Sequence, residues 1–484
     1  MLDALSGIVD LERAASVSLY RQLYTQLRDA ILNGHLPAGT RIPASRSMAV
    51  QLGVARNTVL AALEQLAAEG YLETRQGAGT VVSGQLRRGL MRAARREPDA
   101  PPPDYSLSRS ADRMAMITRA TPDGENPRAF MPGIPDLESF PRDLWARLLR
   151  RASHELEDSA LAYGGTWGLP RLRAALSDHL REMRGVQADP EQIIVTSSAQ
   201  GALDLLARAM LDPQDKVWVE DPGYLGARAA FSGTGATLVP VPVDKDGLNP
   251  AGNHPRPRLI YVTPSHQYPT GILMPLARRL ELLECASRHG AFIIEDDYDS
   301  EFQFQGRPVA ALQGLDASGR VLYIGTFSKI LQPGIRVGYA VVPPALAEPL
   351  RSLQRNSGHI APGVVQLALA KFIEEGHLRA HVRRTCALYE ERQDALVSAL
   401  EENFGTRMRV NRPAGGMQLV AELPPETDDV ALARSYGERG IVARPLSQLT
   451  LGDHARSGLL MGYAGYPVKD IREAVAACRD IARI

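Results

Sequence analysis

The chain has 484 residues, of which 44% are hydrophobic and 23% charged, and its formal net charge is zero. These values are typical of a globular protein of about three domains. With a net charge of zero, the protein as a whole does not attract nucleic acid electrostatically, so only a local cluster of basic residues could do so. The three cysteines have no zinc or disulfide spacing, the acidic N-terminus is unlike a secretion signal, and no apolar run reaches the roughly 18 residues of a membrane span. We therefore expect a cytoplasmic protein without a metal site or a membrane partner.

Residues 1–84 predict three helices followed by a short β-hairpin. Leucines and an isoleucine recur at every fourth position from Leu19 to Ile31, which indicates an amphipathic helix. Ser45 can cap a second, short helix that runs through Leu52, Gly53 makes the turn, and a third helix covers "ARNTVLAALEQLAAEG". Two strands around a glycine-containing tip follow as a wing. This order is that of a winged helix-turn-helix.

The polar start of the third helix is the predicted DNA contact. In a helix-turn-helix, this end of the second motif helix reaches base edges in the major groove, where Arg can read guanine and Asn adenine. The candidate DNA-binding residues are Arg46, Arg56, Asn57, Thr58 and, at the wing tip, Gln76 and Gly77. The alternative is a three-helix bundle that contacts only proteins. The stretch from Leu36 to Val82 resembles the GntR-type winged helix, which implies binding of a double-stranded bacterial operator.

Residues 85–120 are predicted to be a linker, because five arginines between Arg87 and Arg96 precede three successive prolines. The arginines either touch DNA phosphates or are simply solvated. Residues 121–484 alternate apolar strands such as "AFIIEDD" with helical stretches, which predicts an α/β domain with a mostly parallel sheet buried on both faces. A C-terminal subdomain is expected from about residue 380.

Four stretches of this α/β domain carry candidate chemistry. They are "TSSAQGALDLL", "EDPGYLGAR", "IIEDDYDSEF" and "GTFSKILQPGIRVGY". The last contains Lys329, one of five lysines in a chain with fifty arginines. A lone lysine is usually solvated surface charge, but a lysine amine can also form a Schiff base with an aldehyde. In this order and spacing the four stretches resemble fold-type I aminotransferases.

The resemblance implies pyridoxal 5'-phosphate as the cofactor and Lys329 as its Schiff-base lysine. Asp296 would then pair with the ring nitrogen, which strengthens the ring as an electron sink. Asp297 and Asp299 are expected to serve the local fold. Of His266, Gln267 and Tyr268 in "YVTPSHQYPTG", the sequence does not say which faces the cofactor. The further cofactor-binding candidates are Ser198, Ala199, Gln200, Tyr224, His266, Tyr298, Thr326, Ser328 and Arg336.

Together the two halves resemble the MocR/GabR group of bacterial regulators over almost the whole chain. The resemblance implies a head-to-tail homodimer that binds operator DNA and senses a small-molecule effector. An aminotransferase usually holds the substrate carboxylate with an arginine two residues before a late Gly-Tyr, and here that position is Leu460. Arg228 and Arg444 are candidates to replace it.

The missing arginine leaves several functions open. The effector could be an amino compound, an amine without an α-carboxylate such as an amino sulfonate, or pyridoxal phosphate itself. The alternative to a regulator without physiological turnover is a working aminotransferase with an incidental DNA-binding arm.

Overall fold

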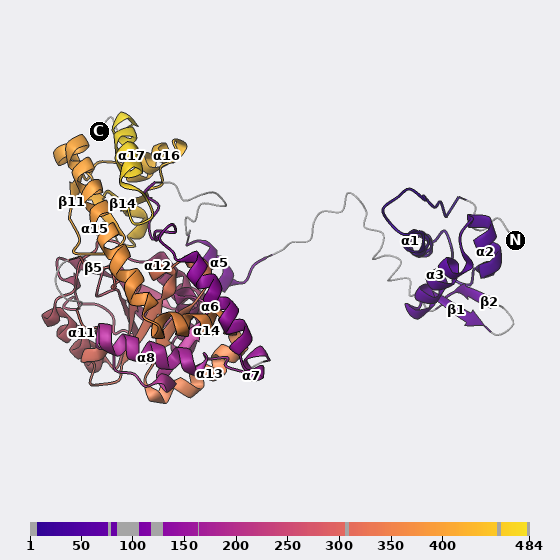
Figure 1. The fold of residues 1–484 in the computed structure, drawn as a ribbon, viewed down its shortest axis with the longest axis horizontal. Helices are drawn as coiled ribbons and strands as arrows, with labels where there is room; N and C mark the ends of the chain where they lie inside the picture. The colour runs from indigo at the N-terminus through magenta and orange to yellow at the C-terminus, as the bar shows by residue number, and fades with distance from the viewer. Residues whose placement is uncertain are drawn as a thin grey trace. The chain divides into compact units, whose positions relative to one another are not determined.

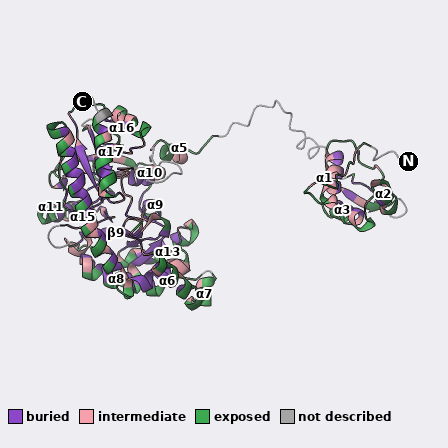
Figure 2. Ribbon diagram, turned by 45° about the horizontal axis from the view of Figure 1, so that its top comes forward, coloured by how far each residue is buried: buried purple, intermediate pink, exposed green. Residues whose placement is uncertain are grey.

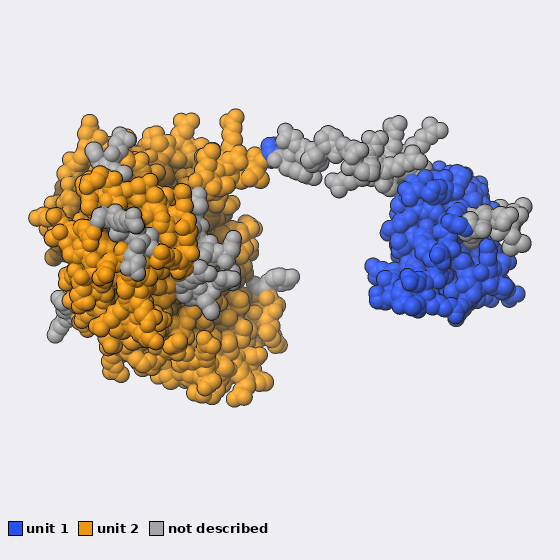
Figure 3. All heavy atoms as spheres, turned by 90° about the horizontal axis from the view of Figure 1, so that it is seen from above, with its two compact units in different colours: residues 1–106 blue, residues 107–484 orange. Residues whose placement is uncertain are grey.

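A computed structural model of the chain describes residues 7–75, 79–84, 106–117, 129–162, 164–304, 309–452 and 456–481. The chain divides into two compact units, residues 1–106 and 107–484, which Figure 3 draws in different colours. Figure 2 shows buried residues in the interior of each unit and exposed residues on the outer faces of its helices. Within the described ranges, no helix is both long and apolar enough to cross a membrane.

The smaller unit is the predicted winged helix-turn-helix. Leu23, Leu27 and Ile31 of its first helix are fully buried and pack against the third helix and the wing. Gly53 ends the second helix with a φ of 62°, a left-handed conformation that glycine adopts without strain. The elements are α1 (Leu19–Leu32), α2 (Ser45–Leu52), α3 (Arg56–Ala68) and the antiparallel strands β1 (Leu72–Arg75) and β2 (Gly79–Val82) (Figure 1).

The end of the stretch predicted as a linker belongs to the larger unit. Helix α5 (Arg109–Ala115) packs on α10 (Leu225–Thr234). Its Ser110 hydroxyl donates to the Gly233 carbonyl over 2.5 Å, and Arg113 Nε donates to the Ser232 carbonyl over 2.7 Å. Residues 107–117 are therefore a docked segment, while the arginine- and proline-rich part lies outside the described residues.

An eight-stranded sheet forms the centre of the larger unit, in the order β3-β10-β9-β8-β7-β4-β5-β6. Strands β9, β8, β7, β4 and β5 are parallel neighbours, whereas β10 is antiparallel to β9 and β3, and β6 to β5. The mostly parallel sheet is thus confirmed. The strands are β3 (Ile193–Thr196), β4 (Lys216–Asp221), β5 (Thr237–Asp244), β6 (Gly247–Leu248), β7 (Leu259–Val262), β8 (Phe292–Asp297), β9 (Val321–Thr326) and β10 (Gly338–Val341).

Helices cover both faces of this sheet. Val195 points into an apolar cluster with the helices α6, α8 and α14, whereas its neighbour Ile194 points into another with α9, α10 and α13. Successive strand residues face opposite sides, so continuous apolar runs such as these indicate two buried faces. The helices are α6 (Arg142–Glu155), α7 (Asp158–Leu161), α8 (Pro170–Arg184), α9 (Ala199–Met210), α11 (Leu276–His289), α12 (Phe327–Ile330), α13 (Pro344–Ser357) and α14 (Gly363–Glu374).

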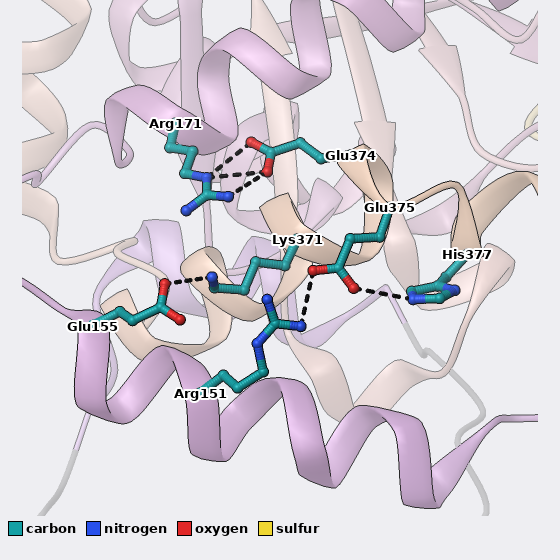
Figure 4. A network of polar contacts seen from close by, with 7 residues as sticks. All are labelled: Arg151, Glu155, Arg171, Lys371, Glu374, Glu375 and His377. Atoms are coloured by element: carbon teal, nitrogen blue, oxygen red, sulfur yellow. Dashed lines mark hydrogen bonds and ion pairs between the residues drawn. The ribbon is translucent and has the colours of Figure 1, made fainter.

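Ion pairs tie α14 to α6 and α8 at the edge of this layer (Figure 4). The buried Lys371 ammonium bonds to Glu155, Arg171 contacts Glu374 over 2.6 Å, and Arg151 contacts Glu375 over 2.9 Å. The last two pairs are substantially exposed and each contributes less than about 1 kcal/mol. The helices are therefore held mainly by their apolar cluster.

A smaller antiparallel sheet forms the C-terminal part, in the order β11-β12-β14-β13. The long helix α15 (His377–Phe404) connects it to the main layer and packs against α17 (Val468–Ile481) (Figure 1). Phe130 and Phe302, from far earlier in the chain, complete its core. The remaining elements are β11 (Arg409–Val410), β12 (Gln418–Glu422), β13 (Arg444–Pro445), β14 (Gly458–Gly462) and α16 (Asp429–Glu438).

Candidate cofactor and DNA-binding sites

The first turn of α3 presents the predicted DNA-reading residues to solvent. Arg56 and Asn57 are exposed and Thr58 is half-buried, while the following Val59 enters the core. Helix α3 begins after Ala55, which offers no side-chain cap, so its first amides lack a capping side chain. Arg46 on α2 is also exposed.

The charges at this end of the unit are not cancelled by acids. Arg56 Nε lies 3.4 Å from Ser45 Oγ, and among the described residues neither Arg56 nor Arg46 forms an ion pair. A cationic surface beside open helix amides suits DNA phosphates. Gln76 and Gly77, predicted at the wing tip, lie outside the described residues.

In the larger unit, the strand register gathers motifs that are 130 residues apart. Gly338 of β10 is the direct partner of Thr196 at the end of β3 and of Thr326 at the end of β9. A Cβ on Gly338 would lie 2.5 Å from the backbone nitrogen of Ala199, so the start of α9 lies directly against this strand. The predicted phosphate-binding segments therefore meet at one place.

Two side chains shape the backbone there. Ser198 caps α9 by accepting from Gly201 N over 3.0 Å, and Thr326 caps α12 by accepting from Ser328 N over 3.2 Å. Ser328 is half-buried. Arg336 is exposed and has a φ of 54°, the left-handed region, which directs its backbone out of the preceding turn. Gln200 is used differently, since its Nε2 donates to the Gly226 carbonyl.

Lys329 extends from the first turn of α12 and contacts a loop that precedes the sheet. Its Nζ donates to the Gly133 carbonyl over 2.7 Å. Gly133 has a φ of +74°, and a Cβ there would lie 2.5 Å from Nζ. The lysine is half-buried rather than solvated. Burial raises the pKa of the Asp296 carboxyl group, and the charge of Lys329 lies near enough to oppose that rise slightly.

Asp296, the penultimate residue of β8, has one carboxylate oxygen bonded and the other without a partner. Oδ2 accepts from the Tyr261 hydroxyl over 2.7 Å, whereas the buried Oδ1 has no hydrogen-bond partner among the described residues. Burial raises the pKa of Asp296 to about 7, although the Tyr261 hydrogen bond acts in the opposite direction. A buried acceptor of this kind needs a donor or a cation, as a protonated pyridine nitrogen would be.

The neighbouring aspartates have structural partners. Asp297 accepts from Arg184 Nε over 2.9 Å and from the Tyr323 hydroxyl over 2.6 Å. Asp299 lies 3.1 Å from His266 Nδ1. Burial alone lowers the pKa of His266, but the Asp299 carboxylate outweighs it and the pKa is raised.

Three tyrosines line the side of the site that the turn 266–268 forms. The Tyr224 and Tyr268 rings meet edge to face with centroids 5.5 Å apart, and Tyr268 and Tyr298 do so at 6.1 Å. The His266 ring is tilted relative to the Tyr298 ring, with centroids 6.4 Å apart. Gln267 uses its amide on the Pro222 carbonyl and on Thr270, so it shapes the turn. Tyr268 is therefore the residue of this turn that joins the aromatic wall.

Leu460 and Arg444 stand side by side at this wall. Leu460 is fully buried in an apolar cluster with Tyr268, against which Tyr224 and Tyr298 pack. Arg444 on β13 is its direct cross-strand partner, and in an antiparallel pair such residues project from the same face. Arg444 Nη1 lies 3.2 Å from the Tyr268 hydroxyl.

Arg228, the other candidate, is bound elsewhere. Its guanidinium is 2% exposed and bonds to Asp221 Oδ1 and the Glu220 carbonyl, each over 3.2 Å. Asp221 also accepts from the Leu451 and Gly452 amides, so the pair fixes a loop.

Two residues of the site were not predicted. Tyr261 was visible as a tyrosine within an otherwise aliphatic buried strand, but its hydrogen bond to Asp296 depends on the pairing of β7 with β8. Gly133 gave no comparable signal, because its role follows from the approach of Lys329 across 196 positions of sequence.

Comparisons with known proteins agree with this division. Residues 19–82 match the family of bacterial regulatory proteins, gntR family, and residues 137–477 match aminotransferase class I and II. The chain is 44% identical over 473 residues to a probable rhizopine catabolism regulatory protein, MocR, of Rhizobium meliloti, covering 97% of this chain and 95% of that protein. It is 33% identical to the HTH-type pyridoxine biosynthesis transcriptional regulator PdxR of Corynebacterium glutamicum, covering 96% of each chain.

A solved enzyme resembles only the larger part. LysN, an α-aminoadipate aminotransferase of Thermus thermophilus solved with N-(5'-phosphopyridoxyl)-L-leucine, has a TM-score of 0.70 and 28% identity. It covers 78% of this chain, and 96% of LysN is covered in turn. The regulators match the whole chain, whereas this enzyme lacks a counterpart for about a fifth of it.

Proposed function

Because the chain belongs to the MocR-type group of GntR-family regulators, we propose that it binds operator DNA and senses a small effector at a pyridoxal phosphate site in its larger unit. The observation that carries the proposal is the occurrence of a half-buried Lys329 and a buried, unbonded Asp296 oxygen in the larger unit of a chain whose smaller unit exposes Arg56 and Asn57. A cofactor site in one unit and a DNA-reading helix in the other serve a single function if the ligand state of the first affects DNA binding by the second.

The residues of the site fit the cofactor. The Asp296 Oδ1 oxygen would receive the ring nitrogen, and the amides at the start of α9 with Thr326, Ser328 and Arg336 would hold the phosphate. Tyr224 and Tyr298 supply flat faces for the ring. Pyridoxal phosphate bound at Lys329 would supply an electrophilic carbon that primary amines can attack.

The wall of the site favours sensing over rapid turnover. Efficient amino-group transfer requires the substrate to be held in one geometry, usually by a bidentate arginine–carboxylate pair. Leu460 offers no such group. The intact Lys329 and Asp296 nevertheless favour slow amine chemistry as a second candidate activity, so the two must be separated by experiment.

We infer that Arg444 contacts the effector. Its guanidinium lies beside Leu460 and reaches Tyr268 at the aromatic wall. It would select an amine that carries an acidic group, either carboxylate or sulfonate, at a position different from that of an ordinary α-amino acid. The effector changes DNA binding only if it binds two arrangements of the chain with different affinity. A dimer, which the family resemblance implies, would present two copies of α3 to two half-sites.

The full-length protein, loaded with pyridoxal phosphate, tests the regulator directly. It should select a duplex from a random DNA pool, and its affinity for that duplex should change with one class of amine. The same amine with keto-acid acceptors should give no sustained multiple turnover. Sustained turnover with unchanged DNA affinity would instead identify an aminotransferase.

Replacement of Arg444 by Gln tests the effector contact. We expect an acidic amine to require about tenfold to hundredfold higher concentration for the same change in DNA affinity, because one charge-assisted hydrogen bond contributes about 1.5–3 kcal/mol. Cofactor absorbance should be retained. Arg434→Gln, an exposed change on nearby α16, is the control. An unchanged response in Arg444→Gln contradicts the assignment.

A further inference from the structure

The first described segment of the chain is fastened along α1 by two glutamines. The backbone N–H of Asp10 donates to Gln26 Oε1 over 2.7 Å, and Gln26 Nε2 donates back to the Asp10 carbonyl over 2.6 Å. Glu12 and Gln22 form the same reciprocal pair, with both distances 2.9 Å. We call residues 7–17 the N-terminal arm.

The spacing of these contacts explains how residues 9–12 of the arm run along α1. Residues two apart on an extended chain are separated by about 6.6 Å, and residues four apart on a helix by about 6 Å. The side-chain amides of Gln22 and Gln26 therefore bond to the backbone N–H and carbonyl groups of Asp10 and Glu12, as the backbone of a neighbouring strand would. Ile8, Val9 and Leu11 pack against the core of the unit and anchor the same segment.

The arm delivers Arg13 to the turn of the helix-turn-helix. Arg13 Nη2 donates to the carbonyl of Gly53 over 2.5 Å. Gly53 ends α2, and α3 begins three residues later at Arg56. The guanidinium is thus held beside the segment that joins the two motif helices.

The charge of Arg13 is not cancelled in this position. A carbonyl is a neutral acceptor, the side chain is exposed, and among the described residues no carboxylate forms an ion pair with it. Elsewhere in the unit arginines do pair with acids: Arg28 lies 2.9 Å from Asp29, and Arg75 lies 2.6 Å from Glu73. Arg13 instead resembles Arg46 and Arg56, which are exposed at the DNA-reading end without acidic partners.

We propose that the N-terminal arm is part of the DNA-binding surface and that Arg13 contacts a phosphate of the DNA backbone beside the start of α3. The inference rests on the operator binding proposed above. The Gly53 carbonyl orients the guanidinium, and its remaining N–H donors serve the phosphate. Such a contact strengthens binding on any sequence and helps to set the register of α3 in the groove.

The test uses the full-length protein and the duplex that it selects from a random pool. Affinity is measured over a range of salt concentrations for the wild type and for Arg13→Ala, Arg13→Gln and Arg13→Lys. Loss of one phosphate contact should weaken binding about fivefold to twentyfold and make the slope of log affinity against log salt shallower by about one. Arg13→Gln keeps a donor for the Gly53 carbonyl but has no charge, so it should behave as Arg13→Ala. Arg13→Lys should keep the wild-type slope.

Arg28→Ala is the matched control, because Arg28 lies over Tyr24, whose hydroxyl bonds to Glu69 at the opposite end of α3. It should leave the salt slope unchanged. A wild-type slope in both Arg13→Ala and Arg13→Gln, even with weakened affinity, would overturn the proposal and leave Arg13 as a support of the turn. If the wild type selects no duplex at all, the operator-binding function itself fails.

Discussion

The pKa of the buried Asp296 carboxylate depends on the group that faces its Oδ1 oxygen. Its pKa of about 7 results from burial and applies to a site in which Oδ1 meets no donor. A cation opposite that oxygen would favour the charged form and lower the pKa again. Binding of a protonated ring and ionisation of Asp296 are therefore coupled.

This coupling predicts a pH-dependent stability for the cofactor-free protein. The pKa of Asp296 is raised above its ordinary value of 3.8, so its contribution to stability is fully present below about pH 4 and is lost as the pH rises through about 7. Asp296→Asn does not titrate. The variant should therefore gain stability relative to the wild type between pH 5 and pH 8, by at most about 3 kcal/mol.

Denaturant unfolding of the two cofactor-free proteins at both pH values measures this difference. Asp178→Asn, at an exposed position of α8, controls for the removal of a carboxylate. A difference between Asp296→Asn and the wild type that is the same at pH 5 and pH 8 would show that burial does not perturb Asp296.

At the scale of elements, the site depends on how closely β10 approaches α9. Strand β10 lies between β3 and β9 and is antiparallel to both. Gly338 begins β10, and its missing side chain allows the start of α9 to lie against the strand. The helix amides and the Thr326–Lys329 turn consequently share one small space.

Gly338→Ala should enlarge this space and weaken cofactor binding. Its Cβ would meet the Ala199 nitrogen at 2.5 Å, and a backbone atom cannot move aside cheaply. We expect at least tenfold weaker binding of pyridoxal phosphate, measured by absorbance titration, together with a lower unfolding temperature. Gly334→Ala, whose Cβ would lie 3.7 Å from Gln332 Oε1, should bind normally. Equal affinities for the two variants would contradict the close-approach argument.

At the scale of the whole molecule, each unit has a core of its own. Among the described residues, the apolar cluster of the smaller unit is formed by residues between 8 and 82, and the clusters around the two sheets are formed by residues from 129 onward. The larger unit begins at residue 107 and so includes α5, which packs on α10. Cofactor binding should thus be a property of the larger unit, and its effect on DNA a property of the intact chain.

Two fragments test this division. Residues 107–484 should fold and bind pyridoxal phosphate with an affinity close to that of the full chain. Residues 118–484 should be less stable by about 2 kcal/mol, because the contacts of Ser110 and Arg113 with α10 are lost. Chemical unfolding of both fragments gives the comparison. Equal stability would show that α5 contributes nothing to the larger unit.

The sequence by itself determined the order of the parts and the identity of the local turns. Helix periodicity, the turn at Gly53 and the TFSK turn at Lys329 depend on neighbours within a few positions, so they can be read from composition and spacing. The winged helix and the mostly parallel sheet were predictable in this way, and the structure agrees with them.

Only the tertiary structure decided which distant residues meet. Tyr268 rather than Gln267 faces the aromatic wall, Arg444 lies beside Leu460 while Arg228 does not, and residues 107–117 dock instead of linking. These outcomes depend on strand register and on the packing of helices, which bring together residues from 16 to almost 200 positions apart. A sequence pattern indicates which face of a helix or strand is buried. Which other element covers that face is decided by the packing of all the elements together.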